Sequence, residues 1–287
     1  MSSQITTAEV EQYQSNVLDI VQQRGSRLRG AVMVDSDVNG KRKFTDQVGT
    51  TEAIKRTSRH GDSPLVNTPH LRRALTLVDY EWGDLIDDAD KIRLLIDPES
   101  AYARNAAWAM GRAMDDEIIS AALGTAYTGV DGTTPVALPA GQKVAANSAG
   151  LTIAKLRSTK ELMDESEVSE DEEKFIACSA KQITDLLEST EVTSSDFNSV
   201  KALVQGEVDT FMGFKFIRSE RLNTDGNGDR QCIAWAKSGL ELGVGADVVT
   251  EIAPRPDKSF SMYVYLSMAV GATRLEEEKI VEIAAVE

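Results

Sequence analysis

Two stretches of the sequence carry oxygen-bearing side chains at spacings that resemble a calcium-binding loop. In DSDVNGKRKFTD (35–46), acidic or amide residues occupy the first, third and fifth positions and Gly40 the sixth, as such loops require. The twelfth position is Asp46 instead of the bidentate Glu, and three basic residues crowd the loop. In NTDGNGDRQCIA (223–234) the twelfth position is Ala234, so the main ligand is missing. We therefore expect a turn at each place and no metal.

The chain's acidic clusters also lack the partners that catalysis would need. DLIDDAD (84–90) and MDDE (114–117) have no histidine nearby, because the only two are His60 and His70. A nucleophilic Cys178 would need one of them as a base, and its apolar neighbours indicate burial. The sequence thus predicts no enzyme, no catalytic residue, no cofactor and no metal site, and the acidic clusters are interpreted as exposed helix faces. A carboxylate-based, metal-dependent enzyme stays as the most distant alternative.

Charge is distributed unevenly along the 287 residues, whose formal net charge is −15. Residues 1–75 contain 11 Lys and Arg against 8 Asp and Glu, a net charge of +3, whereas the rest contains 20 against 38, a net charge of −18. Such parts would complement each other between copies, although an acidic surface also simply favours solubility. The acidic body argues against sequence-specific DNA binding. The candidate residues for contacts between subunits are Lys41, Arg42, Lys43, Lys55, Arg56, Arg59, Asp84, Asp87, Asp88, Asp115, Asp116 and Glu117.

Nothing in the composition indicates a membrane or an oxidising compartment. No apolar run reaches the roughly 18 residues of a membrane span, and the N-terminus lacks the basic start and apolar centre of a signal peptide. The two cysteines, Cys178 and Cys232, lie in apolar contexts. We expect both to be buried free thiols, which suits a reducing interior.

The apolar pattern predicts a mixed α+β fold without internal repeats. Its longest helix starts with Asp97 and Pro98 and ends before Gly124. Residues 206–222, GEVDTFMGFKFIRSERL, alternate apolar and charged side chains as a half-buried strand or hairpin does. Further helices are predicted over 6–24 and 84–96 and from Thr152, Ser179 and Ser195. Extended pieces around a hairpin turn are predicted at Asn39-Gly40, followed by a projecting loop over 49–73. Strands are predicted over 175–178, 232–237, 240–245, 248–254, 259–275 and 279–287, the last two as a pair.

The order of these parts resembles the major capsid protein of tailed double-stranded DNA bacteriophages, which has the Hong Kong 97-type fold. The resemblance runs over nearly the whole chain, and no part of it is a catalytic motif. It rests on the segment 60–118, the strand–helix unit FIACSAKQITDLLES, the progression from Gly206 to Leu222 and the C-terminal YVYLSMAVGATRLEEEKIVEI. The resemblance implies an α+β Hong Kong 97-like fold whose copies assemble as pentamers and hexamers into an icosahedral shell around DNA. Residues 206–222 would then be a structural part of one sheet.

The resemblance also assigns domains and partners. The implied division is an N-terminal arm over 1–33, an extended loop over 34–75, a peripheral domain over 76–149 with a spine helix over 98–123, an axial domain over 150–264, and C-terminal strands over 265–287 that return to the peripheral domain. The roughly 33 residues before the loop are too few for a fused scaffolding domain, so a separate scaffolding protein is expected beside a portal. The resemblance leaves open whether a decoration or cement protein also binds the shell. The expected location is the virion capsid, after assembly in the bacterial host cytoplasm, and the enclosed DNA would be bound without sequence specificity and without a membrane.

One cellular relative of this fold is the nearest alternative. An encapsulin-type nanocompartment shell would enclose a cargo enzyme in place of DNA, and the residues do not separate the two. The Lys, Asn and Glu that form a covalent cross-link in the type member have no match here, so the resemblance does not extend to cross-linking.

Overall fold

The computed structural model describes residues 22–59, 61–86, 98–188 and 210–287, which form three β-sheets and three α-helices. The helix expected over 6–24 lies almost wholly outside these ranges, and its described end, residues 22–24, is not helical. His60, residues 87–97 and the helix expected from Ser195 also lie outside them. No helix among the described residues is long and apolar enough to cross a membrane.

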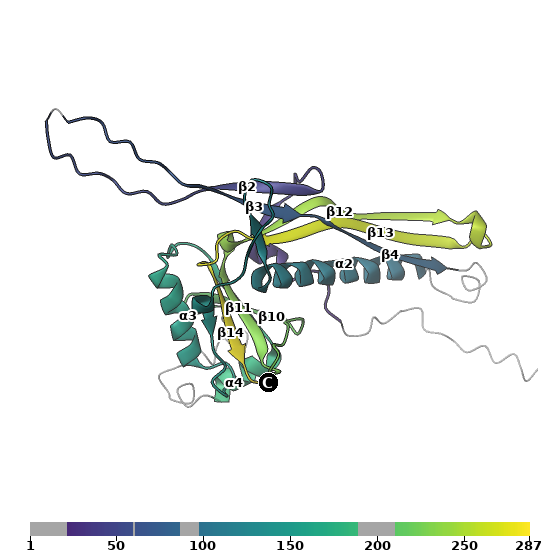
Figure 1. Cartoon of the computed structure of the whole chain (residues 1–287). Helices are drawn as coiled ribbons and strands as arrows, with labels where there is room; N and C mark the ends of the chain where they lie inside the picture. Colours follow the sequence, from purple (N-terminus) through teal and green to yellow (C-terminus); the bar gives the residue numbers. More distant parts are fainter. Residues whose placement is uncertain (1–21, 60, 87–97, 189–209) are drawn as a thin grey trace, which may run out of the picture.

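A long sheet packed on one helix forms the first layer of the molecule (Figure 1). Its strand order is β1 (Met33–Asp35), β12 (Leu240–Pro254), β13 (Met262–Arg274) and β4 (Val78–Ile86), and the helix is α2 (Pro98–Leu123). Every second residue of β13 from Val264 to Val270 is buried and belongs to the same apolar cluster as Met110, Met114 and Ile118 of α2. The predicted bounds of the longest helix are confirmed at both ends.

The sheet corrects one helix prediction. Residues 84–86, expected to begin a short helix, are strand, because β4 pairs with β13 as far as Ile86 opposite Met262. The apolar side chains Tyr80 and Trp82, two residues apart, pack on the core from the same face. A spacing of two satisfies a strand with one covered face and does not suit a helix.

The second sheet lies beyond the end of α2 and carries the other two helices. Its strand order is β7 (Lys143–Val144), β14 (Ile280–Ala285), β11 (Arg230–Ala236), β8 (Lys174–Cys178), β10 (Phe214–Arg218) and β9 (Thr210–Phe211). Helix α3 (Ile153–Glu165) begins after Thr152, whose side chain accepts a hydrogen bond from the backbone N–H of Lys155, and α4 (Ala180–Glu188) begins after Ser179, which contacts Gln182. These helix starts are confirmed.

The segment 206–222 is confirmed as a hairpin over its described part. Strands β9 and β10 pair with Phe211 opposite Phe214, and the turn uses Met212 and Gly213 at positive φ values of 54° and 87°. Phe214 is fully buried, and β10 runs parallel to β8, whose five residues are all buried. This segment therefore holds an edge of the sheet and supplies apolar packing.

The third sheet consists of β2 (Arg42–Val48), β3 (His70–Thr76), β5 (Ala126–Thr128) and β6 (Thr134–Val136). The hairpin predicted around Asn39-Gly40 is wrong. Gly40 does form a turn, at φ 91°, but β1 before it pairs with β12 and β2 after it pairs with β3. Val38 is buried against Gly243, which anchors the chain where it passes from one sheet to another.

Sheet pairing also divides the C-terminal part differently from the sequence. The two strands expected over 240–254 are one strand, β12, with register shifts between Val244 and Val249. The pair expected at the end of the chain does not form, because β13 pairs with β12 and β4 while β14 pairs with β11 and β7. Residues 265–287 therefore belong to two sheets, and only β13 returns to the helix α2.

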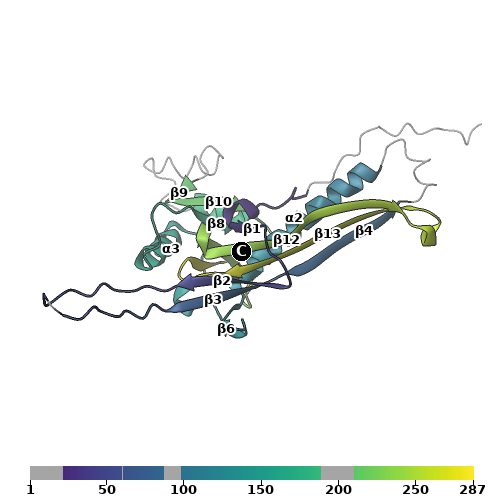
Figure 2. The same cartoon turned by 90° about the horizontal axis from the view of Figure 1, so that it is seen from above.

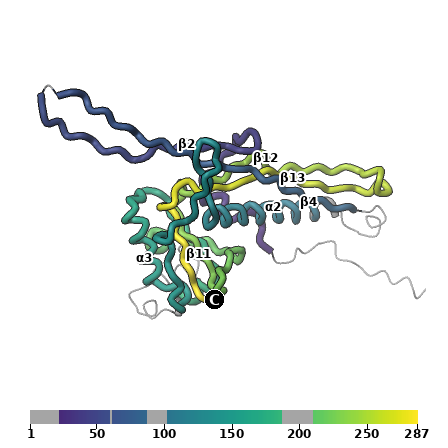
Figure 3. Tube along the Cα trace, in the orientation of Figure 1, coloured from purple at the N-terminus to yellow at the C-terminus, as the bar shows by residue number. Residues whose placement is uncertain are grey.

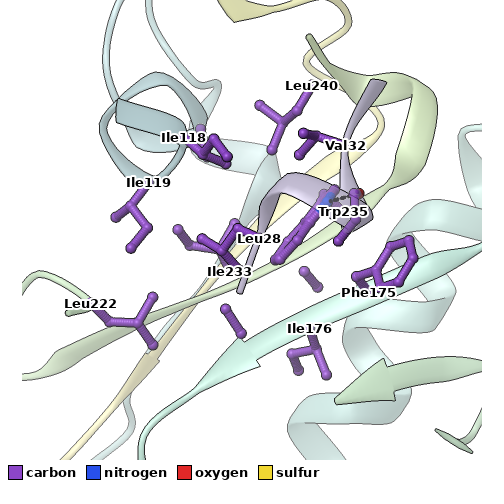
Figure 4. Packing of buried hydrophobic residues seen from close by; sticks show 14 of the residues in the cluster. Leu28, Val32, Ile118, Ile119, Phe175, Ile176, Leu222, Ile233, Trp235 and Leu240 are labelled. Atoms are coloured by element: carbon purple, nitrogen blue, oxygen red, sulfur yellow. Dashed lines mark hydrogen bonds between the residues drawn. The ribbon is translucent and has the colours of Figure 1, made fainter. Parts of the chain in front are cut away.

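A single apolar core joins the layers (Figure 4). Trp235 of β11 is its largest fully buried side chain. Its ring stacks with Phe175 at 6.0 Å between centroids, and its Nε1–H donates a 2.9 Å hydrogen bond to the carbonyl of Ala31. Leu28 and Val32 of the N-terminal segment lie in the same cluster. The first described residues therefore fold as part of the body.

Candidate assembly surfaces

A loop between β2 and β3 projects far from the body (Figures 1 and 3). Its arms are tied at the base by one hydrogen bond of 2.8 Å from the N–H of Gly49 to the carbonyl of Pro69. Every described residue from 50 to 69 is exposed, including Ile54 at 60% and Leu65 at 89%. Apolar side chains on an extension without a core of its own gain burial only from another surface.

A second extension points the opposite way (Figure 2). It consists of the far ends of β12 and β13 and the turn between them, where Phe260 is 63% exposed at a positive φ of 59°. The guanidinium of Arg255 lies 5.2 Å from the ring centroid of Tyr263 and pairs with Asp257 at 2.7 Å. The body thus lies between two exposed extensions.

The basic candidates divide into exposed and internal residues. Lys41, Arg42, Lys55, Arg56 and Arg59 are exposed, the last three on the loop. The remaining candidate, Lys43, is different.

Lys43 makes contacts inside its own subunit. Its Nζ donates a hydrogen bond to Glu241 at 2.8 Å and another to Asp35. The hydrogen bond from Lys43 to Asp35 holds the pKa of Asp35 below its usual value. Thr45 Oγ1 donates to the other carboxylate oxygen of Glu241 at 2.7 Å. Lys43 therefore ties β2 to β12, which separates it from the other five.

The acidic candidates also separate once their partners are known. Asp84 is exposed on β4, whereas Asp87 and Asp88 lie outside the described residues. Asp116 pairs with Arg221 through two hydrogen bonds, one of 2.6 Å, and Glu117 accepts a hydrogen bond from the hydroxyl of Tyr80. These contacts are internal and leave the carboxylates partly exposed.

Asp115 is not available to a neighbouring subunit, which corrects its selection as a contact residue. It is fully buried in α2 where residues 22–28 cross the helix. Its carboxylate accepts hydrogen bonds from the backbone N–H of Arg27 at 3.0 Å and of Leu28 at 3.1 Å, and from Ser26 Oγ and Gln23 Nε2 at 2.5 Å each. Its role is to anchor the N-terminal segment, which the pattern of adjacent acidic residues could not show.

A buried charged group at the base of the loop was not predicted. Arg73 of β3 donates to the carbonyl of Leu275 at 2.9 Å and to Glu277 at 2.5 Å. Arg274 lies 3.4 Å from the other oxygen of Glu277 and donates to the carbonyls of Ala122 at 3.0 Å and Gly124 at 2.8 Å. Arg274 thereby satisfies carbonyl groups at the C-terminal end of α2. The group connects the loop base, the spine helix and β13.

In each of the two calcium-like stretches, a carboxylate that would bind the metal has partners within the chain. Asp35 contacts Lys43, and the carboxylate of Asp225 accepts the N–H groups of Asn227 at 2.8 Å and Asp229 at 2.9 Å, as in a turn. Within the described ranges, no group of three or more His, Cys, Asp or Glu could hold a metal ion. The turn at Asp225 is as expected, whereas residues 35–46 run from β1 through the turn at Gly40 into β2 and do not form the expected hairpin.

Both cysteines are buried free thiols, as expected. Burial raises the pKa of the Cys178 thiol to about 12 and raises that of Cys232 as well. A thiol that stays protonated at neutral pH is a poor nucleophile.

Comparison with known proteins extends over the whole of this architecture. The family model described as "Phage capsid protein" matches residues 5–287. The capsid of cyanophage P-SCSP1u is similar in structure at a TM-score of 0.76 and 17% identity, with 99% of this chain and 94% of that chain covered. The capsid of cyanophage Pam1 is similar at a TM-score of 0.69 and 16% identity, with 98% of this chain and 97% of that chain covered. The capsid of a native GTA particle computed with C5 symmetry is similar at a TM-score of 0.66 and 15% identity, with 96% of this chain and 95% of that chain covered. No curated protein matches.

The family match covers almost the whole chain, and the solved capsids share its α+β fold at nearly equal lengths. The absence of an enzymatic role, expected from the sequence, is confirmed by membership of a structural family. The loop, the long helix and the paired sheets are therefore parts of a coat protein with the Hong Kong 97-type fold. The chain belongs to the phage capsid protein family and has the structural role of a major capsid protein.

Proposed function

We propose that copies of this chain assemble through the projecting loop into a closed icosahedral shell of pentamers and, in larger shells, hexamers, which encloses double-stranded DNA. The observation that carries this proposal is the loop itself. Its residues 50–69 are exposed, and apolar side chains such as Leu65 have no cover within the subunit. Similarity to a capsid computed with fivefold symmetry supports the pentamer. Obligate interfaces of this kind bury on the order of 2,000–5,000 Å².

A division of labour within the subunit follows the sheets. We assign 1–33 to the N-terminal arm and 34–75 to the extended loop. The peripheral domain would comprise 76–142 with α2, extended by β12 and β13. The axial domain would comprise the six-stranded sheet, which includes β7, with α3 and α4. This assignment modifies the boundaries expected from the sequence, because β12 pairs beside α2 and β14 pairs with β11.

The proposal includes partners and a place. A separate scaffolding protein, a portal and a decoration or cement protein are proposed on the strength of the family. The location is the virion, after assembly in the host cytoplasm. Enclosed DNA in the particle would separate a phage head from a nanocompartment shell that holds a cargo enzyme.

Charge gives the loop a direction for docking. Lys55, Arg56 and Arg59 lie exposed on the loop, and the acidic body of a neighbouring copy offers carboxylates such as the exposed Asp84. Exposed ion pairs contribute only about 0–1 kcal/mol each, so they would orient the loop and speed assembly more than hold it. Apolar residues of the loop would supply the burial.

A charge reversal on the loop tests this docking. Replacing Lys55, Arg56 and Arg59 with Glu should slow or misdirect shell formation, measured by light scattering and electron microscopy, while the subunit's circular dichroism stays unchanged. Raising salt from 0.1 to 1 M should weaken the same step, because the Debye length falls from about 10 to about 3 Å. The matched control keeps charge at the three positions by exchanging Lys and Arg. Equal assembly yields and salt dependence in both variants would refute docking through charge.

A further inference from the structure

A cluster of arginines surrounds one tryptophan on the side of α2 that faces away from β13. Arg104, Trp108 and Arg112 are four residues apart, so they share one side of the helix. At 3.6 residues per turn, Trp108 lies roughly opposite Met110, which packs in the core beside β13. Trp108 is half-buried and Arg104 is exposed. Both side chains therefore contribute to the surface on this side of the helix.

The N-terminal segment adds two more guanidinium groups where it crosses the helix. Arg24 lies with its Cζ 5.3 Å from the Trp108 ring centroid, and Arg104 lies 5.9 Å from it. Arg112 donates to the side chain of Gln22 at 3.0 Å and to the carbonyl of Gln23 at 3.1 Å. Arg27 donates to the carbonyl of Arg218 at 2.6 Å. We call these four arginines together with Trp108 the arginine strip.

The strip brings four basic side chains together in a chain of net charge −15. Of the described carboxylates next to it on α2, Asp115 accepts hydrogen bonds from the crossing segment and Asp116 pairs with Arg221. All four cations are arginines, and one planar guanidinium group can donate two parallel hydrogen bonds to two oxygens of a phosphate. The partly exposed indole adds an aromatic face, on which guanidinium groups already lie.

We propose that the arginine strip contacts the sugar–phosphate backbone of the enclosed DNA, without reading its sequence. This inference rests on the proposed function, because it needs a shell that encloses nucleic acid. A shell one subunit thick has two faces, and the helical spacing puts Trp108 roughly opposite Met110, which packs in the core with β13. The proposal therefore assigns the strip's side of α2 to the inner face of the shell.

The test measures binding of the unassembled full-length chain to a fluorescein-labelled 30-base-pair duplex by anisotropy, between about 50 and 200 mM salt. The variant Arg24→Gln/Arg104→Gln removes the two guanidinium groups that lie near the Trp108 ring and keeps Arg27 and Arg112 in place. Each lost phosphate contact should reduce the slope of log K against log salt by about 0.9, so the slope should fall by about 1.8. The control Lys55→Gln/Arg56→Gln removes the same charge from the loop and should leave the slope unchanged. The change in tryptophan fluorescence on DNA binding should be absent in Trp108→Phe.

Besides a wild-type chain that does not bind the duplex, three outcomes overturn the inference. One is an equal loss of slope in the strip and loop variants, which would indicate a general charge effect. Another is a fluorescence change that persists in Trp108→Phe. The third is binding of polyglutamate at the same concentrations as DNA, which would favour an acidic surface of a second copy. Electron microscopy of the wild-type chain keeps the two proposals apart. If wild-type shells form but the wild-type chain does not bind the duplex, only the inference about the strip is refuted, whereas absence of wild-type shells would refute the proposed function.

Discussion

Replacing Asp115 with Ala should destabilise the subunit strongly, although the residue belongs to an acidic run on a helix. The carboxylate is fully buried and accepts two backbone N–H groups, of Arg27 and Leu28, besides two side-chain donors. Each buried donor left without an acceptor costs about 1–3 kcal/mol, so the two backbone groups alone predict a loss of about 2–6 kcal/mol. For chains of this size 1 kcal/mol corresponds to roughly 2–4 °C in melting temperature. The expected decrease is therefore at least about 4 °C.

The neighbouring residue provides a matched control. Asp116→Ala removes the same group one position later, but this carboxylate is 44% exposed and pairs with Arg221 at the surface, where ion pairs contribute about 0–1 kcal/mol. Differential scanning calorimetry of the two unassembled variants measures the difference. Asp115→Asn should fall between wild type and Asp115→Ala, because its amide keeps one acceptor oxygen. Melting temperatures of Asp115→Ala and Asp116→Ala within about 1 °C of each other would refute the anchoring role.

Four further predictions address other parts of the molecule. Glu277→Gln should lower the free energy of unfolding in urea by about 3–5 kcal/mol, since it leaves two buried arginines without their anion; an unchanged midpoint would contradict this. Replacing residues 50–68 with a two-residue turn should keep the cooperative thermal transition but abolish stable shells, and a lost transition would place the loop in the core. Because burial raises the pKa of Cys178 and Cys232, a thiol reagent at pH 8 should label them only after denaturation; rapid labelling of the native subunit would count against burial. The wild-type chain and the variant Asp225→Ala should each have the same melting temperature with calcium as with a chelator. A rise in melting temperature with calcium that occurs in the wild type and is lost in the variant would indicate a calcium site.

The sequence predicted helix ends and a hairpin correctly where the residues that form them lie close together in the sequence. Asp97 before α2, Pro98 as its first residue and Gly124 after it place the helix correctly, as does Thr152 before α3. The hairpin of 206–222 follows from Gly213 and the alternation around it. These features depend on residues close in sequence, so the sequence alone is enough to predict them.

Contacts between distant segments explain the errors. Asn39-Gly40 has the composition of a hairpin turn, yet the strand before it pairs with residues about 200 positions later. Such pairing depends on which strands meet in three dimensions and leaves no local mark.

The same limit applies to charged residues. Asp115 and Asp116 are adjacent and alike in sequence, but only the crossing of residues 22–28 decides that one is buried. Gly111 permits that crossing, since a Cβ there would meet the backbone of Gly25 at 2.5 Å. The spacing of Arg104, Trp108 and Arg112 was visible in the sequence, but its meaning depended on Arg24 arriving from another segment.

Electron cryomicroscopy of particles assembled from the full-length chain would show whether its copies build a closed shell through the projecting loop. We expect closed shells with fivefold vertices, in which the loop between β2 and β3 of each subunit lies on its neighbour and buries Ile54 and Leu65. Small open oligomers, or shells in which these two side chains stay exposed to solvent, would contradict it.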